Sequence, residues 1–489
     1  MEFHMNICCI LPYSSSTNRN HYEQDILIQS GLYELESSLN KMGFSVLLLD
    51  FLSNEQSDPQ DLNTILQQFH PDVLCINSFI CFEDYLWLYE HLSPNFREIP
   101  HIIFGVGALD YERILSENFM VDYVVPAYPE IVLPDLLLRM KKHLSYNKIQ
   151  GVAYKNGGRI IYEKRIEADT TAFFPITDIE KFISKKDSTV AFYYSSKGCW
   201  YGKCKFCTVG AAYQGSLKWI PCDLERVCSD IQTLYNFGVR MISFLDDQFI
   251  GPGKNGYNRT LDLVDYLSKF PDLKFTIRTR ITTFDNLLLE KMIKAGLSCV
   301  FIGIESCNDR FLQLINKGVT YNDIEKQWTY LIQSPIKVIP GMLLAHPLSN
   351  LSDIREHLVR LRHLYKGCYE KMDIHMLFHE LHLHAGTPIY KETYDEYCGN
   401  LPSECTCFYS DFLVSRCIRH FSLMYRVVER NLTDIQTNYN SHYFNFCIYR
   451  LKVKLFQWLL EITQLVETND DMNIENFIET VISKWRYGS

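Results

Sequence analysis

The chain has 489 residues, with 48 Lys and Arg against 58 Asp and Glu, which gives a formal net charge of −10. This length suits two or three domains, and the negative charge argues against nucleic acid or an anionic membrane as the main partner. No apolar run approaches the roughly 20 residues of a membrane helix, and the first residues lack the pattern of a signal peptide. We therefore expect a cytoplasmic protein whose 17 cysteines are mostly reduced and buried.

Residues 1–148 alternate short apolar runs with segments of helical spacing. The runs predict five strands, at Asn6–Leu11, Phe44–Leu49, Val73–Asn77, Ile102–Val106 and Tyr123–Val125. Tyr22–Met42 has helical spacing, and Gly43 is suited to end that helix. Near-continuous apolar strands between helices are typical of a parallel sheet that is covered on both faces. The sequence therefore predicts an α/β fold that begins with a doubly wound, Rossmann-like domain.

Ligands of a doubly wound sheet bind beyond the carboxyl ends of its strands. In this chain those ends carry Asn77, Ser78, Gly105, Gly107 and Tyr128. No Gly-x-Gly-x-x-Gly follows the first strand, so a dinucleotide site is not expected. A tight turn is the alternative interpretation of Gly105 and Gly107.

A β-hairpin is predicted after this domain. Val152–Tyr154 and Arg159–Tyr162 flank an Asn-Gly turn at Asn156 and Gly157, which is a strong hairpin signal. The segment that follows is polar as far as about Lys186. We interpret residues 149–187 as a hairpin and a linker between domains.

Residues 188–395 form a second series of alternating strands and helices. The predicted strands are Val190–Tyr194, Met241–Leu245, Lys274–Arg280, Cys299–Ile304, Lys337–Leu344 and Met376–His384. The helices between them include Cys222–Phe237, Leu261–Lys269 and Leu287–Ala295. This pattern predicts a partial parallel (β/α)6 barrel, in which function lies at the carboxyl ends of the strands.

Three cysteines lie close together after the first barrel strand. Cys199, Cys204 and Cys207 have the spacing C-x4-C-x2-C, and Gly198 and Gly202 allow the backbone to bend around a bulky group. Three thiolates on one loop suit an iron–sulfur cluster or zinc. A closed structural zinc site needs four ligands, whereas a cubane cluster held by three cysteines keeps one iron open for a small molecule.

Polar residues follow three other predicted barrel strands. They are Asp246, Asp247, Arg278, Arg280, Glu305 and Ser306. Strand alternation puts Arg278 and Arg280 on one face, where two buried cations need an anion or lie exposed at the strand end. Gly303 shares a face with Glu305 and leaves room for its carboxylate.

The last predicted strand brings Glu380, His382 and His384 to one face. We interpret these three residues as candidates for acid–base chemistry or substrate contact. The alternatives are a mononuclear metal site and histidines that are merely packed or solvated.

Residues 396–489 are predicted to form a helical domain that caps the barrel or recognises substrate. Its helices are expected at Asp411–Glu429, Phe444–Val466 and Met472–Trp485. Cys405 and Cys407 are ligand candidates for a second cluster, with ordinary burial as the alternative.

Together these motifs resemble the radical S-adenosylmethionine (SAM) superfamily, and in particular its subgroup with an N-terminal domain of the cobalamin-binding type. The resemblance covers roughly residues 1–395. It is carried by the cysteine loop, by Ile302-Gly303-Ile304-Glu305-Ser306, and by Pro340-Gly341 and Ala385-Gly386-Thr387-Pro388. The first cysteine gap is one residue longer than the usual C-x3-C-x2-C, and Cys199-Trp200-Tyr201-Gly202 is similar to loops of peptide-modifying members. Asp246-Asp247 stands where many members carry Gly-Gly-Glu.

The resemblance implies three cofactors. A [4Fe-4S] cluster is expected on the three cysteines, and cobalamin is possible on the carboxyl edge of the first domain. SAM is expected to bind the open iron and to contact Phe206, Asp246, Asp247, Arg278, Arg280, Glu305 and Ser306. No Asp-x-His-x-x-Gly occurs in the first domain, so cobalamin would bind without a histidine lower ligand. A domain that has kept the fold and lost the cofactor is the alternative.

The implied function is the generation of a 5′-deoxyadenosyl radical after one-electron reduction by a donor such as flavodoxin or ferredoxin. With cobalamin, the expected reaction is methyl transfer to an unactivated carbon of a peptide or natural product. Without cobalamin, a radical epimerase or cyclase is expected. A non-catalytic iron–sulfur or cobalamin carrier and a zinc-stabilised α/β protein are the alternatives from other classes.

Overall fold

The protein was analysed as a computed structural model. It describes residues 5–12, 32, 35–51, 61–78, 83–117, 120–144, 149–163, 183, 187, 189–212, 219–396, 404–406, 408–438, 441–468 and 471–487. The chain divides into two compact units. Unit 1 comprises Met1–Arg278, Lys294–Leu297 and Leu383–Cys405. Unit 2 comprises Thr279–Ile293, Ser298–His382 and Thr406–Ser489.

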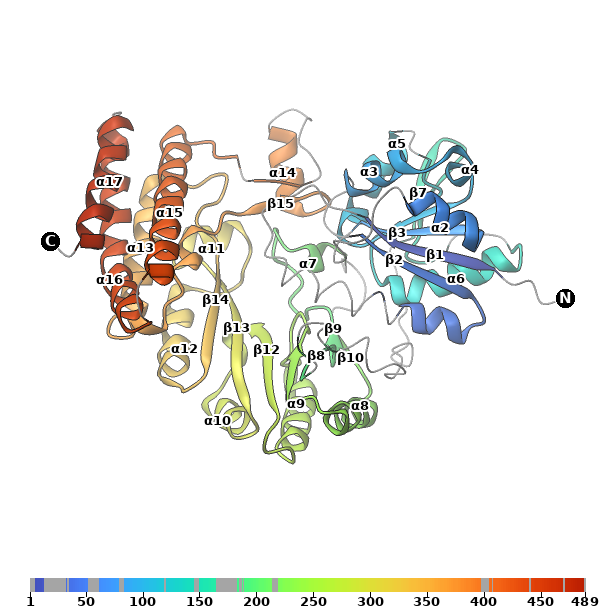
Figure 1. Cartoon of the computed structure of the whole chain (residues 1–489), viewed down its shortest axis with the longest axis horizontal. Helices are drawn as coiled ribbons and strands as arrows, with labels where there is room; N and C mark the ends of the chain where they lie inside the picture. Colours follow the sequence, from blue (N-terminus) through green and yellow to red (C-terminus); the bar gives the residue numbers. More distant parts are fainter. Residues whose placement is uncertain are drawn as a thin grey trace. The chain divides into compact units, whose positions relative to one another are not determined.

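Unit 1 begins with a seven-stranded sheet of strand order β2-β1-β3-β4-β5-β6-β7. Figure 1 labels its strands β1, β2, β3 and β7. Its first five strands are parallel: β1 (Asn6–Leu11), β2 (Ser45–Asp50), β3 (Val73–Asn77), β4 (His101–Phe104) and β5 (Tyr123–Val125). All five agree with the predicted strands to within two residues at either end. The doubly wound domain is thus confirmed, with β1 at the point where the strand order reverses.

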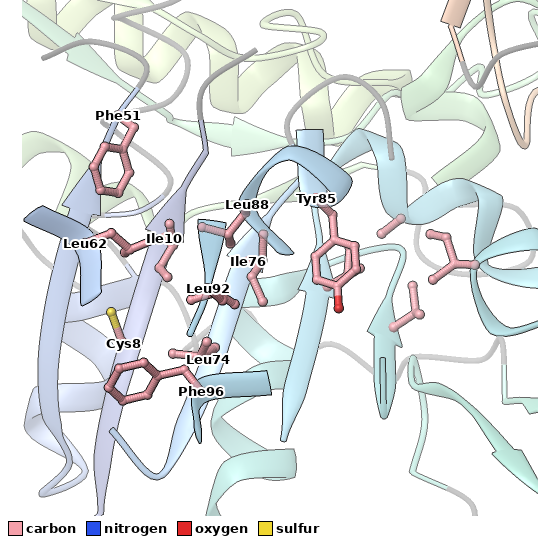
Figure 2. Close-up of a cluster of buried hydrophobic side chains, with 14 of the residues drawn as sticks. Cys8, Ile10, Phe51, Leu62, Leu74, Ile76, Tyr85, Leu88, Leu92 and Phe96 are labelled. Atoms are coloured by element: carbon pink, nitrogen blue, oxygen red, sulfur yellow. The ribbon is translucent and has the colours of Figure 1, made fainter. Parts of the chain in front are cut away.

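Five helices follow these strands: α2 (Leu62–Phe69), α3 (Glu83–His91), α4 (Pro94–Arg97), α5 (Tyr111–Ser116) and α6 (Pro129–Lys141). Figure 2 shows Leu62, Leu88 and Phe96 of α2, α3 and α4 gathered over side chains of β1 and β3. The predicted Tyr22–Met42 helix is described at residue 32 and residues 35–41. Gly43 ends it with φ +78, and the amide of Phe44 donates to Leu39 O, which is the hydrogen bond of a glycine C-cap.

The predicted hairpin is present as β6 (Ala153–Asn156) and β7 (Arg159–Tyr162). Gly157 and Gly158 form its turn at φ +55 and φ +79, as a two-residue hairpin turn requires. The interpretation of this hairpin as part of a linker was wrong, because β6 pairs antiparallel with β5 and extends the first sheet. Residues 164–182 lie outside the described residues.

The second sheet has five strands in the order β14-β13-β12-β11-β8. They are β8 (Val190–Tyr193), β11 (Met241–Phe244), β12 (Lys274–Arg280), β13 (Leu297–Glu305) and β14 (Lys337–Met342). β8 pairs parallel with β11, β11 with β12, and β13 with β14. Both β12 and β13 have residues in each of the two units. The predicted parallel sheet of the barrel is confirmed.

The helices that follow these strands are α7 (Thr208–Ala212), α8 (Leu224–Phe237), α9 (Gly253–Leu267), α10 (Asn286–Lys294), α11 (Asp309–Leu314), α12 (Tyr321–Gln333) and α13 (Leu351–Leu364). Helix α8 begins at Asp223, whose side chain accepts from the amide of Arg226, and it ends at Gly238 with φ +114. A small antiparallel ladder of β9 (Ser196–Lys197) and β10 (Ile220–Pro221) flanks the cysteine loop.

The predicted sixth strand, Met376–His384, is largely wrong. Residues His375–Phe378 form the 3₁₀ helix η7, and only β15 (His382–His384) is extended. Local hydrogen bonds explain the difference, because the amide of His375 donates to Asp373 Oδ1 and the amide of Leu377 donates to Ile374 O. Within the described residues, β15 pairs with β16 (Glu404–Thr406) instead of the five-stranded sheet. Helix α14 (Pro388–Glu396) follows β15.

The end of the chain is helical, as predicted. It contains α15 (Phe412–Asn438), α16 (Ser441–Leu465) and α17 (Asp471–Tyr487), which pack against one another in unit 2. At the start of α17, the carboxylate of Asp471 accepts hydrogen bonds from His420, Arg416 and Arg419 of α15. Among the described residues, no helix combines the length and apolarity that a membrane span needs.

We expect Leu74→Ala to lower the free energy of unfolding by about 2–5 kcal/mol, because Leu74 is completely buried in the core of the first sheet. Urea denaturation followed by circular dichroism measures this change. The control is Leu144→Ala, which truncates a side chain that is 50% exposed and should shift the free energy by less than about 0.5 kcal/mol. Equal effects of the two substitutions would contradict the assignment of this core.

Candidate functional site

The cysteine loop begins directly after β9. Gly198 and Gly202 adopt φ +77 and φ +56, which confirms that the loop needs glycine at both positions. Cys199, Cys204 and Cys207 are all partly buried, and none is in a disulfide. The loop ends at Cys207, where α7 begins. Phe206 lies partly buried in the turn between the last two cysteines.

The three thiols are electrostatic neighbours. Burial is the main cause that raises the pKa of Cys207 to about 12, the charges of Cys204, Asp247 and Cys199 act in the same direction, and a backbone hydrogen bond from Gly210 opposes them. The charges of the other two cysteines thus both act on Cys207. Within the described part of the chain, no three His, Cys, Asp or Glu side chains converge as a finished ligand set for a metal ion. The donor atoms suit an iron–sulfur cluster, and their role as its ligands stays a prediction.

Asp246 holds the segment before the loop. Its carboxylate is completely buried and accepts hydrogen bonds from the amide and hydroxyl of Ser195, at 3.0 and 2.8 Å, and from the hydroxyl of Ser196. Burial raises the pKa of Asp246, and these hydrogen bonds oppose the increase. Because both carboxylate oxygens are used in this way, the structure favours a supporting role for Asp246 over direct contact with a ligand.

Asp247 lies against the cysteine loop itself. Its Oδ2 atom accepts a hydrogen bond of 3.0 Å from the amide of Gly198, the residue before Cys199. Burial raises the pKa of Asp247 to about 6, the Gly198 hydrogen bond and the positive charge of Arg278 lower it, and the charge of Asp246 raises it. Asp247 and Arg278 therefore come together beside the loop in unit 1. Of the two predicted aspartates, Asp247 is the better placed to meet an ammonium group.

Glu305 belongs to unit 2 and has an unusual backbone. Its φ is +69, a value that glutamate rarely adopts and that marks stored strain. Its Oε1 atom lies 2.7 Å from the ammonium of Lys317, and both side chains are nearly buried. A Cβ atom added to Gly303 would lie 2.7 Å from that oxygen and 2.8 Å from the ammonium nitrogen, so Gly303 leaves room for the pair, as predicted. Arg280 donates to the carbonyl oxygen of Lys317.

Ser306 is fixed by a buried histidine. The Nδ1 atom of His357 accepts a hydrogen bond from the amide of Cys307, and the hydroxyl of Ser306 lies 3.0 Å from the same nitrogen. Burial lowers the pKa of His357 to about 4, so its imidazole is neutral at pH 7. The Ser306 hydroxyl in turn accepts from the amide of Asn308. These contacts give Ser306 a structural role, and its contact with a ligand stays a prediction.

Polar groups pack closely together at the carboxyl edge of the first sheet. Gly105 adopts φ +97, and a Cβ atom there would clash with Oδ1 of Asn77 and approach Ser78 O to 2.6 Å. The Asn77 Oδ1 atom is buried and has no hydrogen-bond partner within the described part of the chain. The amide of Gly107 donates to Ser78 O, which closes the turn. Tyr128 is buried at φ +49 at the start of α6.

Two contacts link this edge to the cysteine loop within unit 1. Lys197, two residues before Cys199, forms an ion pair of 2.9 Å with Glu130 of α6. Helix α7, directly after Cys207, packs against the 3₁₀ helix η2 (Val106–Asp110), which follows β4. Burial and the charges of Glu130 and Asp247 raise the pKa of Tyr128, which places its phenol in the same neighbourhood.

The predicted catalytic residues are separated by the unit boundary. Glu380 lies in unit 2 and accepts hydrogen bonds from Tyr409 and Ser422 at 3.4 and 3.3 Å. His382 is exposed, whereas His384 is partly buried in unit 1. Leu383 between them is completely buried, so the two histidines do share one face of β15. Nothing in these contacts brings all three side chains to one reacting group, and their catalytic role stays a prediction.

Sequence reasoning missed four residues of the site: Glu130, Lys197, Lys317 and His357. The sequence alone contains no signal that pairs these residues. Each contact joins positions from different elements and depends on packing.

Residues 193–361 match the family model described as the radical SAM superfamily, in line with the predicted resemblance. An uncharacterized methyltransferase of Pyrococcus horikoshii is 24% identical over 295 residues, which cover 58% of this chain and 62% of that protein. The 4′-phospho-dehydrooxetanocin synthase of Priestia megaterium is 26% identical over 279 residues, which cover 47% of this chain and 36% of that protein. The chain thus spans less than two thirds of the length of these relatives.

Solved structures with the same fold cover more of the chain. The cobalamin-dependent SAM radical enzyme OxsB, solved with aqua-cobalamin and SAM, has a TM-score of 0.75 at 15% identity over 99% of this chain and 80% of its own. The radical SAM methyltransferase TsrM from Kitasatospora setae, solved with cobalamin and a [4Fe-4S] cluster, has a TM-score of 0.61 at 14% identity over 81% of this chain and 75% of its own. At this identity the likeness establishes the shared fold, which confirms the predicted fold class.

The buried imidazole of His357 predicts a pH-dependent stability. Its pKa falls from 6.5 in the unfolded chain to about 4 in the folded chain, so the unfolded state binds the extra proton between these values. Stability is therefore complete above about pH 6.5 and falls by about 3 kcal/mol as the pH drops to 4.

Urea denaturation at several pH values measures this effect. We expect His357→Gln to flatten the profile between pH 4 and 6.5. The control is His363→Gln, which removes a histidine whose side chain is 64% exposed and should leave the profile as in the unmodified protein. An unchanged profile in His357→Gln would contradict the assignment.

Proposed function

We propose that this chain, which carries a radical SAM domain at residues 193–361, is a cobalamin-dependent radical SAM methyltransferase. The substrate we propose is a peptide or another natural product, which is methylated at an unactivated carbon. The observation that carries the proposal is the glycine-bent loop with Cys199, Cys204 and Cys207 in that domain, next to Asp247. When bound there, a [4Fe-4S] cluster supplies the single electron that cleaves the carbon–sulfur bond of SAM.

The protein's own groups prepare the loop for this cofactor. Three thiols provide three soft ligands, so one iron stays open to the amino and carboxylate groups of SAM. Asp247 is oriented by the Gly198 amide, and its carboxylate suits the ammonium of SAM. Arg278, whose charge acts on Asp247, supplies a cation for the carboxylate of SAM. Contacts from Phe206, Arg280, Glu305 and Ser306 remain part of the proposal.

Glu305 is proposed to accept hydrogen bonds from the ribose hydroxyls of SAM. Its Oε1 atom is held by the ion pair with Lys317, which fixes the direction of the carboxylate. A carboxylate held in place before binding loses little freedom when it accepts a hydroxyl.

We propose cobalamin on the carboxyl edge of the first sheet. The buried Oδ1 atom of Asn77, which has no hydrogen-bond partner within the described residues, is an acceptor that suits a polar ligand there. The fold shared with OxsB and TsrM, whose solved structures contain cobalamin, supports this assignment. The electron donor is proposed to be a small redox protein such as a flavodoxin or ferredoxin.

The cluster assignment is tested by replacing Cys199, Cys204 and Cys207 with Ala, singly and together. We expect the triple variant to lose its iron, its brown colour and all formation of 5′-deoxyadenosine and S-adenosylhomocysteine after anaerobic reconstitution and reduction. Iron analysis and product chromatography measure these losses. The control, Cys228→Ala, removes a partly buried cysteine outside the loop and should retain all three properties.

Each result distinguishes the proposal from its rivals. Iron content unchanged in the triple variant would overturn the cluster assignment. Zinc in place of iron would favour a zinc-stabilised protein. A cluster without either product would favour a non-catalytic carrier.

The cobalamin assignment is tested with Gly105→Ala. The added methyl group clashes with Asn77 and displaces this side chain, so we expect cobalamin retention to fall about tenfold or more while the iron content stays the same. Absorbance spectra of protein purified anaerobically with cobalamin measure this loss. Gly158→Ala is the matched control, since Gly158 has a similar φ of +79 but no atom within 4 Å of an added Cβ. Equal cobalamin content in both variants would contradict the site.

A further inference from the structure

The cysteine loop is attached to the first sheet on both sides. Before the loop, Lys197 reaches Glu130 of α6. After the loop, α7 packs against η2. Helix α6 and η2 both follow strands of the first sheet at its carboxyl edge. The loop is therefore attached at both of its ends. Of these two described contacts, the one made by Lys197 is an ion pair.

The ion pair of Lys197 and Glu130 is buried. Their facing atoms lie 2.9 Å apart, and each side chain is only 10% exposed. The ammonium of Lys197 also lies 5.1 Å from the ring centroid of Tyr194, which stabilises its charge. Glu130 lies in the first turn of α6, where the helix dipole stabilises a carboxylate. Removing either partner of such a buried ion pair is strongly destabilising, because the charge of the other partner is then buried without compensation.

The backbone of Lys197 connects this ion pair to the cysteine loop. Lys197 pairs with Ile220 in the β9–β10 ladder. The next residue, Gly198, donates its amide to Asp247, and Cys199 follows directly. Lys197 is thus separated from Cys199, the first proposed cluster ligand, only by Gly198, whose amide is hydrogen-bonded.

We propose that Glu130 and Lys197 are positioning residues, whose ion pair orders the cysteine loop by fixing it to the carboxyl edge of the first sheet. This inference rests on the proposed function only for the consequence that an ordered loop retains its cluster. The ordering itself is a property of the protein chain. Neither residue was assigned a role by its sequence pattern, and neither is proposed to contact the reacting atoms.

The test is hydrogen–deuterium exchange of the full chain without reconstitution. We expect Glu130→Gln and Lys197→Met each to speed amide exchange across residues 198–212 by about tenfold. The double variant should be no faster than either single variant, because both remove the same pair. Lys197→Arg retains the charge and should keep slow exchange. Exchange in β1 and β3 reports whether each variant is folded.

The matched control is Lys205→Met. This substitution removes another ion pair of the same loop, Lys205 with Glu392, whose side chains are 35% and 53% exposed. Such an exposed pair contributes little, so the exchange of residues 198–212 should change less than twofold. Loop exchange as slow in Glu130→Gln and Lys197→Met as in the unmodified protein would overturn the inference. So would an additive effect in the double variant.

A second measurement uses the reconstituted protein. We expect chelators to remove iron several times faster from Glu130→Gln and Lys197→Met than from the unmodified protein and Lys197→Arg. If the unmodified chain binds no iron, the proposed function fails, whereas the exchange result still decides the role of the ion pair. If iron binds and loop exchange is unchanged in the variants, the ion-pair inference fails and the proposed function stands.

Discussion

The candidate site depends on two adjacent carboxylates at the end of β11. A completely buried carboxylate is costly unless hydrogen bonds compensate for the loss of water, and Asp246 obtains them from Ser195 and Ser196. Asp247 accepts a hydrogen bond from the amide of Gly198, which lies only two residues after Ser196 in the chain. One dipeptide therefore fixes the chain immediately before Cys199. The buried carboxylates need hydrogen-bond donors, and the segment from Ser195 to Gly198 provides them. These hydrogen bonds position the cysteine loop.

Parallel strands explain why so many polar groups meet at the same edges. All strands of a parallel sheet end on the same side, so the residues that follow them lie together without any repeat in the sequence. In unit 1 this brings Asn77 and Gly105 together at one edge. The Lys197–Glu130 pair then joins that edge to the cysteine loop. A fold of this kind joins the cysteine loop to the carboxyl edge of the first sheet through a short polar link.

In unit 2 the fold maintains backbone strain at Glu305. Glu305 has a left-handed backbone, which the surrounding structure maintains through Lys317 and the amide of Leu343. Such strain persists only where neighbouring contacts outweigh it, and it is typical of functional positions. The fold itself is shared with proteins of about 15% identity. Function must therefore be argued from groups such as these instead of the fold.

The sequence by itself determined the elements whose signals are local. Strands β1, β3, β5 and β12 agree with their predicted bounds because each is a short run with turn residues or polar residues at its ends. Gly43 and Gly238 ended their helices for the same local reason. The spacing of the cysteines likewise located the loop, since three thiols within nine residues need no tertiary information to be close.

Only the tertiary structure decided which distant groups meet. The hairpin was predictable from the sequence Asn156-Gly157-Gly158, but its pairing with β5 depends on contacts outside the hairpin. The strand predicted at Met376–His384 failed because hydrogen bonds of Asp373 and Ile374 favoured a turn over extension. Lys197 and Glu130, or Ser306 and His357, carry no mutual signal in the sequence. Periodicity and turn chemistry act between neighbours in the chain, whereas the pairing of buried charges is settled by packing.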